Sequence, residues 1–185
     1  TGLGGDDTLT GGAQNDRFLY PGDTAPFTGT PESGFDVLVG NTGTDEVVAT
    51  GGDVVVGLRS FTGIEVFRGQ AGPQRFGILG DGTANTFSFA TATVEHLDWV
   101  DGGDGDDTIT AATTGTIGMI RGGAGNDTLT GGARDDVLVG GAGADHLTGG
   151  AGADIFRFFA AADSTRTARD VITDFVPARG DRIDL

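Results

Sequence analysis

The sequence predicts an all-β fold, a parallel β-roll or β-solenoid of nonapeptide repeats that ends in a C-terminal capping segment. The main observation is residues 122–157, where four nine-residue blocks follow one another without a gap: GGAGNDTLT, GGARDDVLV, GGAGADHLT and GGAGADIFR. Each block reads G-G-x-G-x-D-x-U-x, in which U is a large apolar residue. This nonapeptide is a known solenoid repeat, so the motif itself identifies the fold. The 36 glycines of the 185-residue chain agree with it.

The two parts of a block favour different local structures. Positions 1 to 6 are rich in glycine, which tolerates positive φ and allows a tight turn whose carbonyls point to one side. Positions 7 to 9 favour a short strand, in which side chains alternate and position 8 faces inward. One block cannot bury its single apolar side chain, so coils of two blocks must stack. The residues at position 8 are Leu129, Leu138, Leu147 and Phe156.

Position 6 places aspartates eighteen residues apart on the two flanks of such coils, Asp127 with Asp145 and Asp136 with Asp154. At strand spacing the members of each pair lie within about 5 Å, where like charges repel. A hard cation that takes six or more oxygen ligands at about 2.3 to 2.6 Å converts this repulsion into binding. We therefore expect calcium between successive turns, held by position-6 carboxylates and by the carbonyls of positions 1 to 4. The alternative is that the aspartates only cap turns.

The composition is acidic and lacks cysteine. Asp and Glu number 27 against 11 Lys and Arg, and the formal net charge of −16 disfavours a compact state until cations bind. Nucleic acids and anionic membranes attract basic surfaces, so we expect neither as a partner. The absence of cysteine excludes a disulfide framework and thiolate metal sites. The chain contains no run of eighteen apolar residues, so the sequence predicts no membrane-spanning helix. No signal peptide is recognised, and Thr1 begins inside a repeat, so we expect a fragment of a longer protein.

We expect four segments along the chain. Residues 1–48 carry N-terminal repeats with an inserted loop at 20–32, and residues 49–101 form degenerate β-solenoid coils that lack the position-6 aspartates. A separate small β-sandwich is the alternative for this second segment, because the sequence period does not separate the two. Residues 102–157 form the main roll, and residues 158–185 form a cap over its last coil. The core of the second segment is expected to contain Phe61, Phe67, Phe76, Phe87, Phe89 and Trp99.

Within the cap, the apolar residues expected to cover the ladder that ends at Phe156 are Phe175, Ile183 and Leu185. Two spacings depart from eighteen residues. If the turns are counted around the inserted loop, Asp7 stacks on Asp36 and Asp16 stacks on Asp45. Asp107 and Asp127 are twenty residues apart, and we expect a two-residue bulge to keep them stacked.

The repeats and the tail together resemble the repeats-in-toxin (RTX) family, also called hemolysin-type calcium-binding proteins. The tail is similar to the C-terminal region of serralysin-type proteases, whose typical ending is F…D-S…D-x-I-x-D-F…D-x-I-D-L. The resemblance is close over residues 1–19, 33–48 and 102–185 and loose over residues 49–101. It implies secretion by a Gram-negative bacterium through a type I channel and folding on external calcium. The matching tail residues are Phe158, Asp163, Ser164, Asp170, Ile172, Asp174, Phe175, Asp181, Ile183, Asp184 and Leu185.

The resemblance also implies several Ca²⁺ ions and a set of ligand residues. The carboxylates implied are Asp7, Asp16, Asp36, Asp45, Asp107, Asp127, Asp136, Asp145 and Asp154. Asp170 and Asp174 are expected to close the last turn. The turn residues expected to line the sites are Gly102, Asp104, Gly122, Gly123, Ala124, Gly125, Gly131, Gly132, Ala133, Gly140, Gly141, Ala142, Gly143, Gly149, Gly150, Ala151 and Gly152.

The expected function is that of a non-catalytic extracellular calcium-binding module, which folds after type I secretion and supports the folding and stability of a larger secreted or surface protein. The chain has no H-E-x-x-H and no G-x-S-x-G, so we predict no catalytic residue and no cofactor besides calcium. His96 and His146 are expected to be solvated. The expected partners are calcium ions and the type I secretion machinery, with self-association and surface partners left open. The alternatives are a structural segment of a surface-layer protein or adhesin, and the C-terminal part of a secreted protease, lipase or epimerase.

Overall fold

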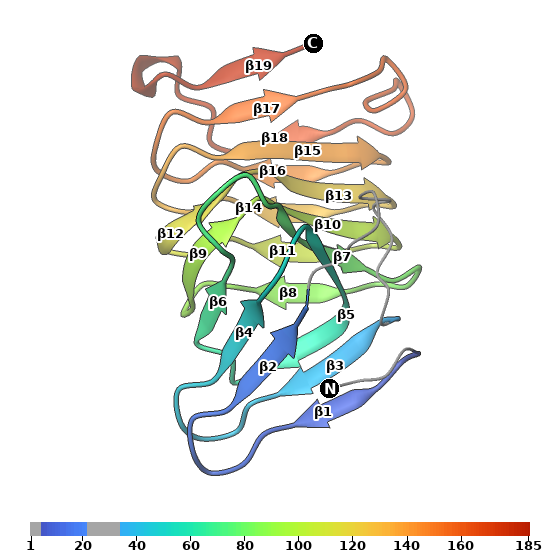
Figure 1. Cartoon of the computed structure of the whole chain (residues 1–185). Helices are drawn as coiled ribbons and strands as arrows, with labels where there is room; N and C mark the ends of the chain where they lie inside the picture. The colour runs from blue at the N-terminus through green and yellow to red at the C-terminus, as the bar shows by residue number, and fades with distance from the viewer. Residues whose placement is uncertain (1–4, 22–33) are drawn as a thin grey trace.

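The structure is a computed structural model that describes residues 5–21 and 34–185. Most of the inserted loop expected at 20–32 therefore lies outside the described residues. The described part forms a stack of short strands, with β1 and β19 at opposite ends (Figure 1). Every strand pairing in this part of the chain is parallel. The predicted all-β solenoid is thus confirmed.

The strands lie on three faces of the stack, and β5 runs across the first two of them, so that these two faces form one 14-stranded sheet. The first face holds the amino-terminal half of β5 (Val54–Thr62), β7 (Phe76–Gly80), β10 (Trp99–Asp104), β13 (Ile120–Ala124), β15 (Val137–Ala142), β17 (Ile155–Arg157) and β19 (Arg182–Asp184). The second face holds β1 (Thr8–Thr10), β3 (Asp36–Val39), the rest of β5, β8 (Thr86–Ser88), β11 (Thr108–Thr110), β14 (Thr128–Thr130), β16 (His146–Thr148) and β18 (Val171–Ile172). The third face is a separate sheet of β2 (Arg17–Tyr20), β4 (Glu46–Ala49), β6 (Val66–Arg68), β9 (Thr93–Leu97) and β12 (Thr114–Ile117).

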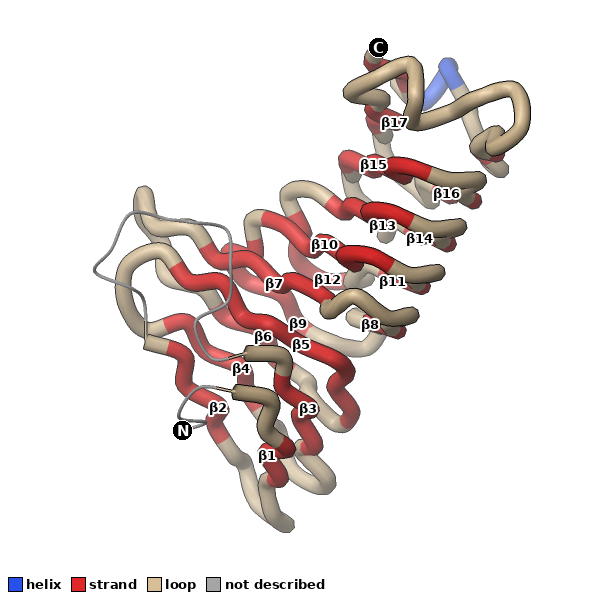
Figure 2. The backbone as a smooth tube through the Cα atoms, turned by 90° about the vertical axis from the view of Figure 1, so that its right-hand side faces the viewer, coloured by secondary structure: helices blue, strands red, loops and turns tan. Residues whose placement is uncertain are grey.

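The cross-section of the solenoid changes along the stack (Figure 2). The first two coils use the second and third faces, the middle coils use all three, and the coils after β12 use the first and second. The position-6 residues Asn85 and Asp107 are 22 residues apart, whereas Asp127 and Asp145 are 18 apart. The longer coils have enough residues for a third strand, and the shorter coils do not.

The middle segment continues the solenoid. Its strands β5 to β10 pair in parallel with strands before and after them, which is not the arrangement of a separate sandwich. Asp107 stacks on Asp127, but the extra residues do not form the two-residue bulge that the spacing predicted. They belong to β12, the last strand of the third face, which pairs with β9 and has a register shift between Gly115 and Ile117. A third side therefore accommodates the longer coil.

Apolar ladders fill the interior. The predicted position-8 residues Leu129, Leu138, Leu147 and Phe156 are fully buried, as expected for inward-facing positions. In the wider middle coils, the rings of Phe61, Phe67, Phe87 and Phe89 make mutual contacts at centroid distances of 4.8 to 6.0 Å. Bulky rings fill the space that a third side opens.

The expectation that Trp99 belongs to this core is wrong. Trp99 is half-buried, and its partner in β7 is Gly77, across which the indole ring lies. Val100 is fully buried. Because neighbouring side chains in a strand point to opposite sides, the inward direction of Val100 places Trp99 on the outer surface.

Helical structure in the described residues is limited to the 3-10 helix η1 (Pro177–Arg179) in the tail. No helix within residues 5–21 and 34–185 has the length and apolar character that crossing a membrane requires.

The tail adds rungs to the roll. Strand β18 pairs with β16, and β19 pairs with β17 in a register that places Ile183 next to Phe156. The ring of Phe175 meets that of Phe156 edge-on at 6.1 Å. Leu185 does not help to cover the ladder, because it is 96% exposed beyond the end of β19. The expectation for Leu185 was therefore wrong, and the sheet ends one residue before it.

We expect deletion of residues 158–185 to raise the calcium concentration needed for folding by about tenfold and to promote aggregation. The deletion exposes Phe156 and the strand edges of β16 and β17, and exposing one Phe side chain costs about 1.5 to 3 kcal/mol. Calcium titration followed by circular dichroism and light scattering measures both effects. The control is Leu185→Ala, which removes a side chain that is already exposed. An unchanged midpoint in a monomeric truncated chain would contradict a capping role.

Candidate calcium-binding turns

The candidate aspartates lie in turns on the two edges of the second face. We call the turns that lead into second-face strands the upstream column and the turns that leave those strands the downstream column. The upstream column contains Asp7, Asp36, Asn85, Asp107, Asp127, Asp145 and Asp170. The downstream column contains Asp16 and Asp45 near one end of the stack and Asp136, Asp154 and Asp181 near the other.

One hydrogen bond recurs from coil to coil in both columns. The backbone N–H of Asp107 donates to Oδ1 of Asp127 at 2.8 Å, and that of Asp127 donates to Oδ1 of Asp145 at 2.8 Å. The N–H of Asp136 donates to Oδ1 of Asp154 at 3.0 Å. The same bond joins Asp7 to Asp36 and Asp16 to Asp45, so the structure brings together the pairs expected from the sequence.

The second oxygen of these side chains is left open. Among the described residues, the buried side-chain oxygens without a hydrogen-bond partner are all at this one position of the turns. They are Oδ2 of Asp45, Asp107, Asp127, Asp145, Asp154 and Asp170, and Oδ1 of Asn85. A buried polar atom without a partner is costly, and more so when it carries charge. Calcium binds carboxylate oxygen, so these open oxygens fit the ion that the motif implies.

The first glycine of each turn makes room for the open oxygen. A Cβ placed on Gly102, Gly122 or Gly140 would lie within 3.0 Å of Oδ2 of the aspartate five residues later, closer than real Cβ contacts. The same holds for Gly131 and Gly149. Glycine at position 1 therefore preserves the space into which the carboxylate points.

The other turn positions stack closely on the neighbouring coil. Gly123 and Gly141 have φ values of 123° and 109°, and a Cβ on either would collide with a carbonyl of the coil below. Gly125, Gly143, Gly150 and Gly152 are likewise at positive φ above backbone atoms of the preceding coil. The carbonyls of Ala124 and Ala142 each accept one amide, from Gly105 at 2.7 Å and from Gly125 at 2.9 Å. Only residues without a Cβ permit this approach at the glycine positions.

In three predicted carboxylates, a hydrogen-bond donor of the protein occupies Oδ2. Oδ2 of Asp16 accepts the amide of Gly12 at 2.5 Å, and Oδ2 of Asp136 accepts the amide of Gly132 at 2.6 Å. Oδ2 of Asp36 accepts a hydrogen bond from the Tyr20 hydroxyl at 3.0 Å. Asp36 therefore differs from the open carboxylates of the main roll.

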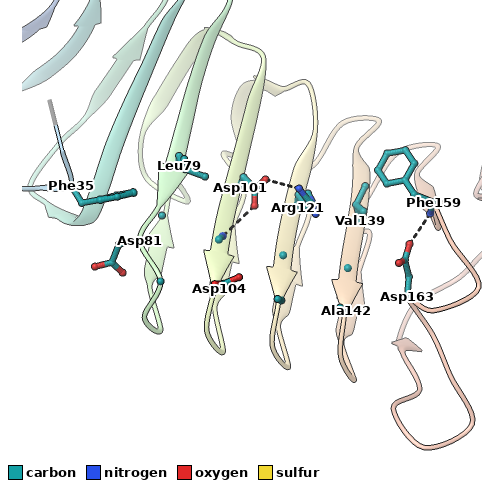
Figure 3. A pocket seen from close by; sticks show the side chains of 16 residues that line it. Phe35, Leu79, Asp81, Asp101, Asp104, Arg121, Val139, Ala142, Phe159 and Asp163 are labelled. Atoms are coloured by element: carbon teal, nitrogen blue, oxygen red, sulfur yellow. Dashed lines mark hydrogen bonds and ion pairs between the residues drawn. The ribbon is translucent and has the colours of Figure 1, made fainter. Parts of the chain in front are cut away.

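Asp104 lies apart from the interior of the turns. Its side chain is exposed and lines a groove on the outer surface of the first face, together with Leu79, Asp101 and Phe159 (Figure 3). Asp104 is at position 3 of its block, where the side chain points outward. The carboxylate of Asp104 therefore differs from the buried position-6 carboxylates.

The tail completes both columns. Oδ1 of Asp170 accepts the amide of Asp145 at 3.1 Å, and the two oxygens of Asp174 accept the amides of Gly149 and Gly150, both at 2.8 Å. Asp181, which the sequence indicated only as a residue of the tail motif, also belongs to the downstream column, because its Oδ1 accepts the amide of Asp154 at 3.2 Å. Residues 181–183 read D-x-I, the D-x-U pattern of positions 6 to 8, and this signal could have identified it.

The sequence analysis missed Glu65. Its Oε2 accepts the amide of Asp45 at 2.9 Å and so takes the place of the next aspartate in the downstream column. Throughout the described part of the chain, no three or more His, Cys, Asp or Glu side chains cluster in a metal-holding arrangement. The carboxylates are paired one coil apart.

Burial dominates the electrostatics of the position-6 carboxylates of the main roll and of Asp170. It raises the pKa of Asp127 to about 7, against the hydrogen bond from the Asp107 amide, which lowers it, and the nearby charge of Asp145 raises it further. Burial likewise raises the pKa of Asp107, Asp136 and Asp170 to about 6 each. In the metal-free fold, such carboxyls hold protons at pH values below about 6 to 7, where a bound cation would have to displace them.

A comparison with protein-family models agrees with this geometry. The model described as RTX calcium-binding nonapeptide repeat (4 copies) matches residues 1–19, 32–56, 97–112 and 120–156, together just over half of the chain. The protein therefore belongs to the family of RTX calcium-binding repeat proteins. A search of curated proteins finds no match. The repeats and the β-solenoid together define a calcium-binding structural module.

We expect Gly140→Ala to raise the calcium midpoint of folding by about tenfold or more. The added Cβ meets Oδ2 of Asp145, and overpacking of this kind costs about 1 to 3 kcal/mol. The matched control is Gly82→Ala, because Gly82 has no atom within 4 Å of a built Cβ and has no positive φ. Circular dichroism during calcium titration compares the two. Equal calcium midpoints for both variants would show that glycine at position 1 is not needed to keep space for Oδ2.

We also expect the apparent calcium affinity to fall as the pH is lowered from 8 to 5.5. The raised pKa values mean that the metal-free fold binds protons more tightly than the unfolded chain. The resulting stabilisation of the metal-free fold is present near pH 4 and is lost as the pH rises through about 6 to 7. Calcium requires the ionised carboxylates, so protons compete with it in the same range. Titrations at pH 8, 7, 6 and 5.5 measure the shift, and a constant midpoint would contradict proton competition.

Proposed function

We propose that this protein is an extracellular module that folds when it binds calcium, after export in an unfolded state through a type I secretion channel. We further propose that it supports the folding and stability of a larger secreted or cell-surface protein of a Gram-negative bacterium. The observation that carries the proposal is the row of open, buried Oδ2 atoms on both edges of the second face. These oxygens are hydrogen-bond acceptors without a donor, and the pairing of strands in successive coils sets the distance from one to the next.

The ligands proposed for each ion come from two successive turns of a column. In the upstream column, Oδ2 of Asp107, Asp127, Asp145 and Asp170 supplies negative charge. In the downstream column, Oδ2 of Asp154 does so, together with the carboxylate of Asp136, whose Oδ2 also accepts the Gly132 amide. The carbonyls of turn positions 1 to 4 add neutral oxygens. A bound calcium ion neutralises the paired carboxylates and links neighbouring coils. Asp45 and Asp16 form the corresponding pair near the N-terminal end.

The charge of the chain makes folding conditional on the ion. A formal net charge of −16 opposes compaction, and 36 glycines raise its cost in backbone entropy. A ligand that binds only the folded state stabilises it in proportion to the logarithm of its concentration, by about 1.4 kcal/mol per site for each tenfold excess. Extracellular calcium modules work at roughly 0.1 to 1 mM, so folding would be confined to calcium-rich surroundings.

The four segments have separate proposed roles. Residues 1–48 and 102–157 carry the calcium turns, residues 49–101 join them, and residues 158–185 cap the last coil. A non-catalytic role agrees with the positions of the two histidines, since His96 and His146 are both exposed. The proposed partners are calcium ions and, during export, the secretion machinery.

The test of calcium-dependent folding compares Asp145→Asn with Asp104→Asn. Asp145 is fully buried with an open Oδ2, whereas Asp104 is an exposed aspartate in the same kind of turn. We expect wild type to lose its β-type circular dichroism in chelator and to regain it at roughly 0.1 to 1 mM calcium. Asp145→Asn should raise this midpoint by about tenfold or more, and Asp104→Asn by less than about twofold. A wild-type spectrum that does not respond to chelator would refute the proposal.

A further inference from the structure

The upstream column is interrupted at one coil. Between Asp36 and Asn85, the residue before the second-face strand is Arg59 in place of an aspartate. Asp36 pairs with Leu58 and Val37 pairs with Ser60, so Arg59 is the extra residue at a register shift between β3 and β5. The shift sets Arg59 at the edge of the second face, where the turns of neighbouring coils stack.

The guanidinium of Arg59 joins carboxylates from two other coils. Its Nε donates to Oδ2 of Asp81 at 2.7 Å, and its Nη2 donates to Oδ2 of Asp6 at 2.5 Å. The Asp81 side chain is only 7% exposed, and the Arg59 side chain is 46% exposed. A buried carboxylate is thus neutralised by a cation that the chain supplies.

Asp81 differs from every open carboxylate of the columns. Its Oδ1 accepts three hydrogen bonds, from the Thr83 amide at 3.0 Å, the Thr83 hydroxyl at 2.6 Å and Nδ2 of Asn85 at 3.1 Å. Its Oδ2 is held by Arg59. Both oxygens are therefore satisfied by the protein, whereas Oδ2 of Asp127 and Asp145 has no donor among the described residues.

The backbone of the turn at 80–85 differs as well. The upstream turns of the main roll have glycine at positive φ at position 2, namely Gly103, Gly123 and Gly141. The corresponding residue here is Asp81, which is not among the residues with positive φ. The position-6 residue is Asn85, whose Nδ2 also donates to the carbonyl of Arg59 at 3.3 Å. Donors of the protein therefore satisfy both oxygens of Asp81, and the one side-chain oxygen of this turn that is buried without a partner, Oδ1 of Asn85, belongs to a neutral amide.

We propose that Arg59 is a built-in cation that takes the place of calcium at the turn 80–85, so that the middle coils close without metal. The inference rests on the proposed function for what the neighbouring turns bind. Guanidinium suits this role because it is always charged, weakly hydrated and carries several donors in a rigid plane. It can bridge carboxylates of different coils, as calcium does in the adjoining turns.

The same chemistry occurs at the end of the downstream column. Nη1 of Arg179 donates to the carbonyl of Gly150 at 2.6 Å, and its Nη2 donates to the carbonyl of Asp174 at 3.1 Å. Gly150 is at position 2 of the last complete repeat, where carbonyls would otherwise face a metal ion. Arg179 thus ends that column with a guanidinium, independently of Arg59.

The consequence is a division of the solenoid. Calcium turns lie on both sides of a middle segment that contains the aromatic core and its own cation. A solenoid propagates order from coil to neighbouring coil, so the middle segment is a template on which both calcium-dependent ends fold.

The test is amide hydrogen exchange of the full chain over a series of calcium concentrations. It compares wild type, Arg59→Gln, Asp81→Asn and the double variant Arg59→Gln/Asp81→Asn. Arg121→Gln is the matched control, because the Arg121 side chain is 45% exposed and pairs with Asp101 on the outer surface. We expect Arg59→Gln to speed exchange in residues 80–88 at least about tenfold, because it leaves a buried carboxylate unpaired, and Arg121→Gln to change it less than about threefold. Arg179→Gln should speed exchange only around residues 149–154 and 182–184.

The double variant decides between charge neutralisation and packing. If Arg59 acts as a cation, removing both charges restores most of the lost protection, and further calcium slows exchange at residues 80–88 in Arg59→Gln alone. If the double variant instead lost as much exchange protection as the two single variants together, the proposal would be overturned. If Arg59→Gln does not fold, a double variant that folds supports the proposal and one that does not fold contradicts it. If exchange in residues 128–157 of wild type did not change with calcium concentration, the proposed function would be contradicted. The failure of the proposed function is thus distinguishable from the failure of the Arg59 proposal.

Discussion

The structure depends on the stacking of carboxylates at the spacing of β-strands. Asp127, Asp145 and Asp154 each use Oδ1 to accept the amide of the aspartate one coil earlier, and their Oδ2 atoms are buried in the turns without a hydrogen-bond partner. The arrangement gathers negative charge where water is excluded, so it is unfavourable unless protons or cations are present. The glycine turns, the acidic composition and the raised pKa values follow from this one arrangement.

The middle coils compensate buried negative charge in a different way. They have a third side filled by Phe61, Phe67, Phe87 and Phe89, and Arg59 neutralises the buried Asp81. Apolar burial and an internal ion pair therefore replace metal binding there. In the three-sided coils of β5 to β9, a longer coil brings more apolar residues into each layer and needs less help from ions.

The sequence by itself determined the repeat class, the inward ladder and most of the candidate ligands. Strict nonapeptide register fixes which residue is at position 6 and which is at position 8, so Asp127, Asp145 and Leu129 are readable from spacing alone. Asp181 was readable in the same way from its D-x-I pattern, although the sequence analysis placed it only in the tail motif. The general reason is that a solenoid relates sequence period to spatial position through a constant number of residues per coil.

Only the tertiary structure decided the features that depend on contacts between coils of unequal length. Residues 114–117 form a third side and not a bulge, Trp99 lies outside because Val100 faces inward, and Tyr20 occupies the second oxygen of Asp36. The pairing of Arg59 with Asp6 and Asp81 joins residues 53 and 22 positions apart. No local pattern marks such a pair, because the register shift that places Arg59 at the turn arises from how β3 and β5 meet.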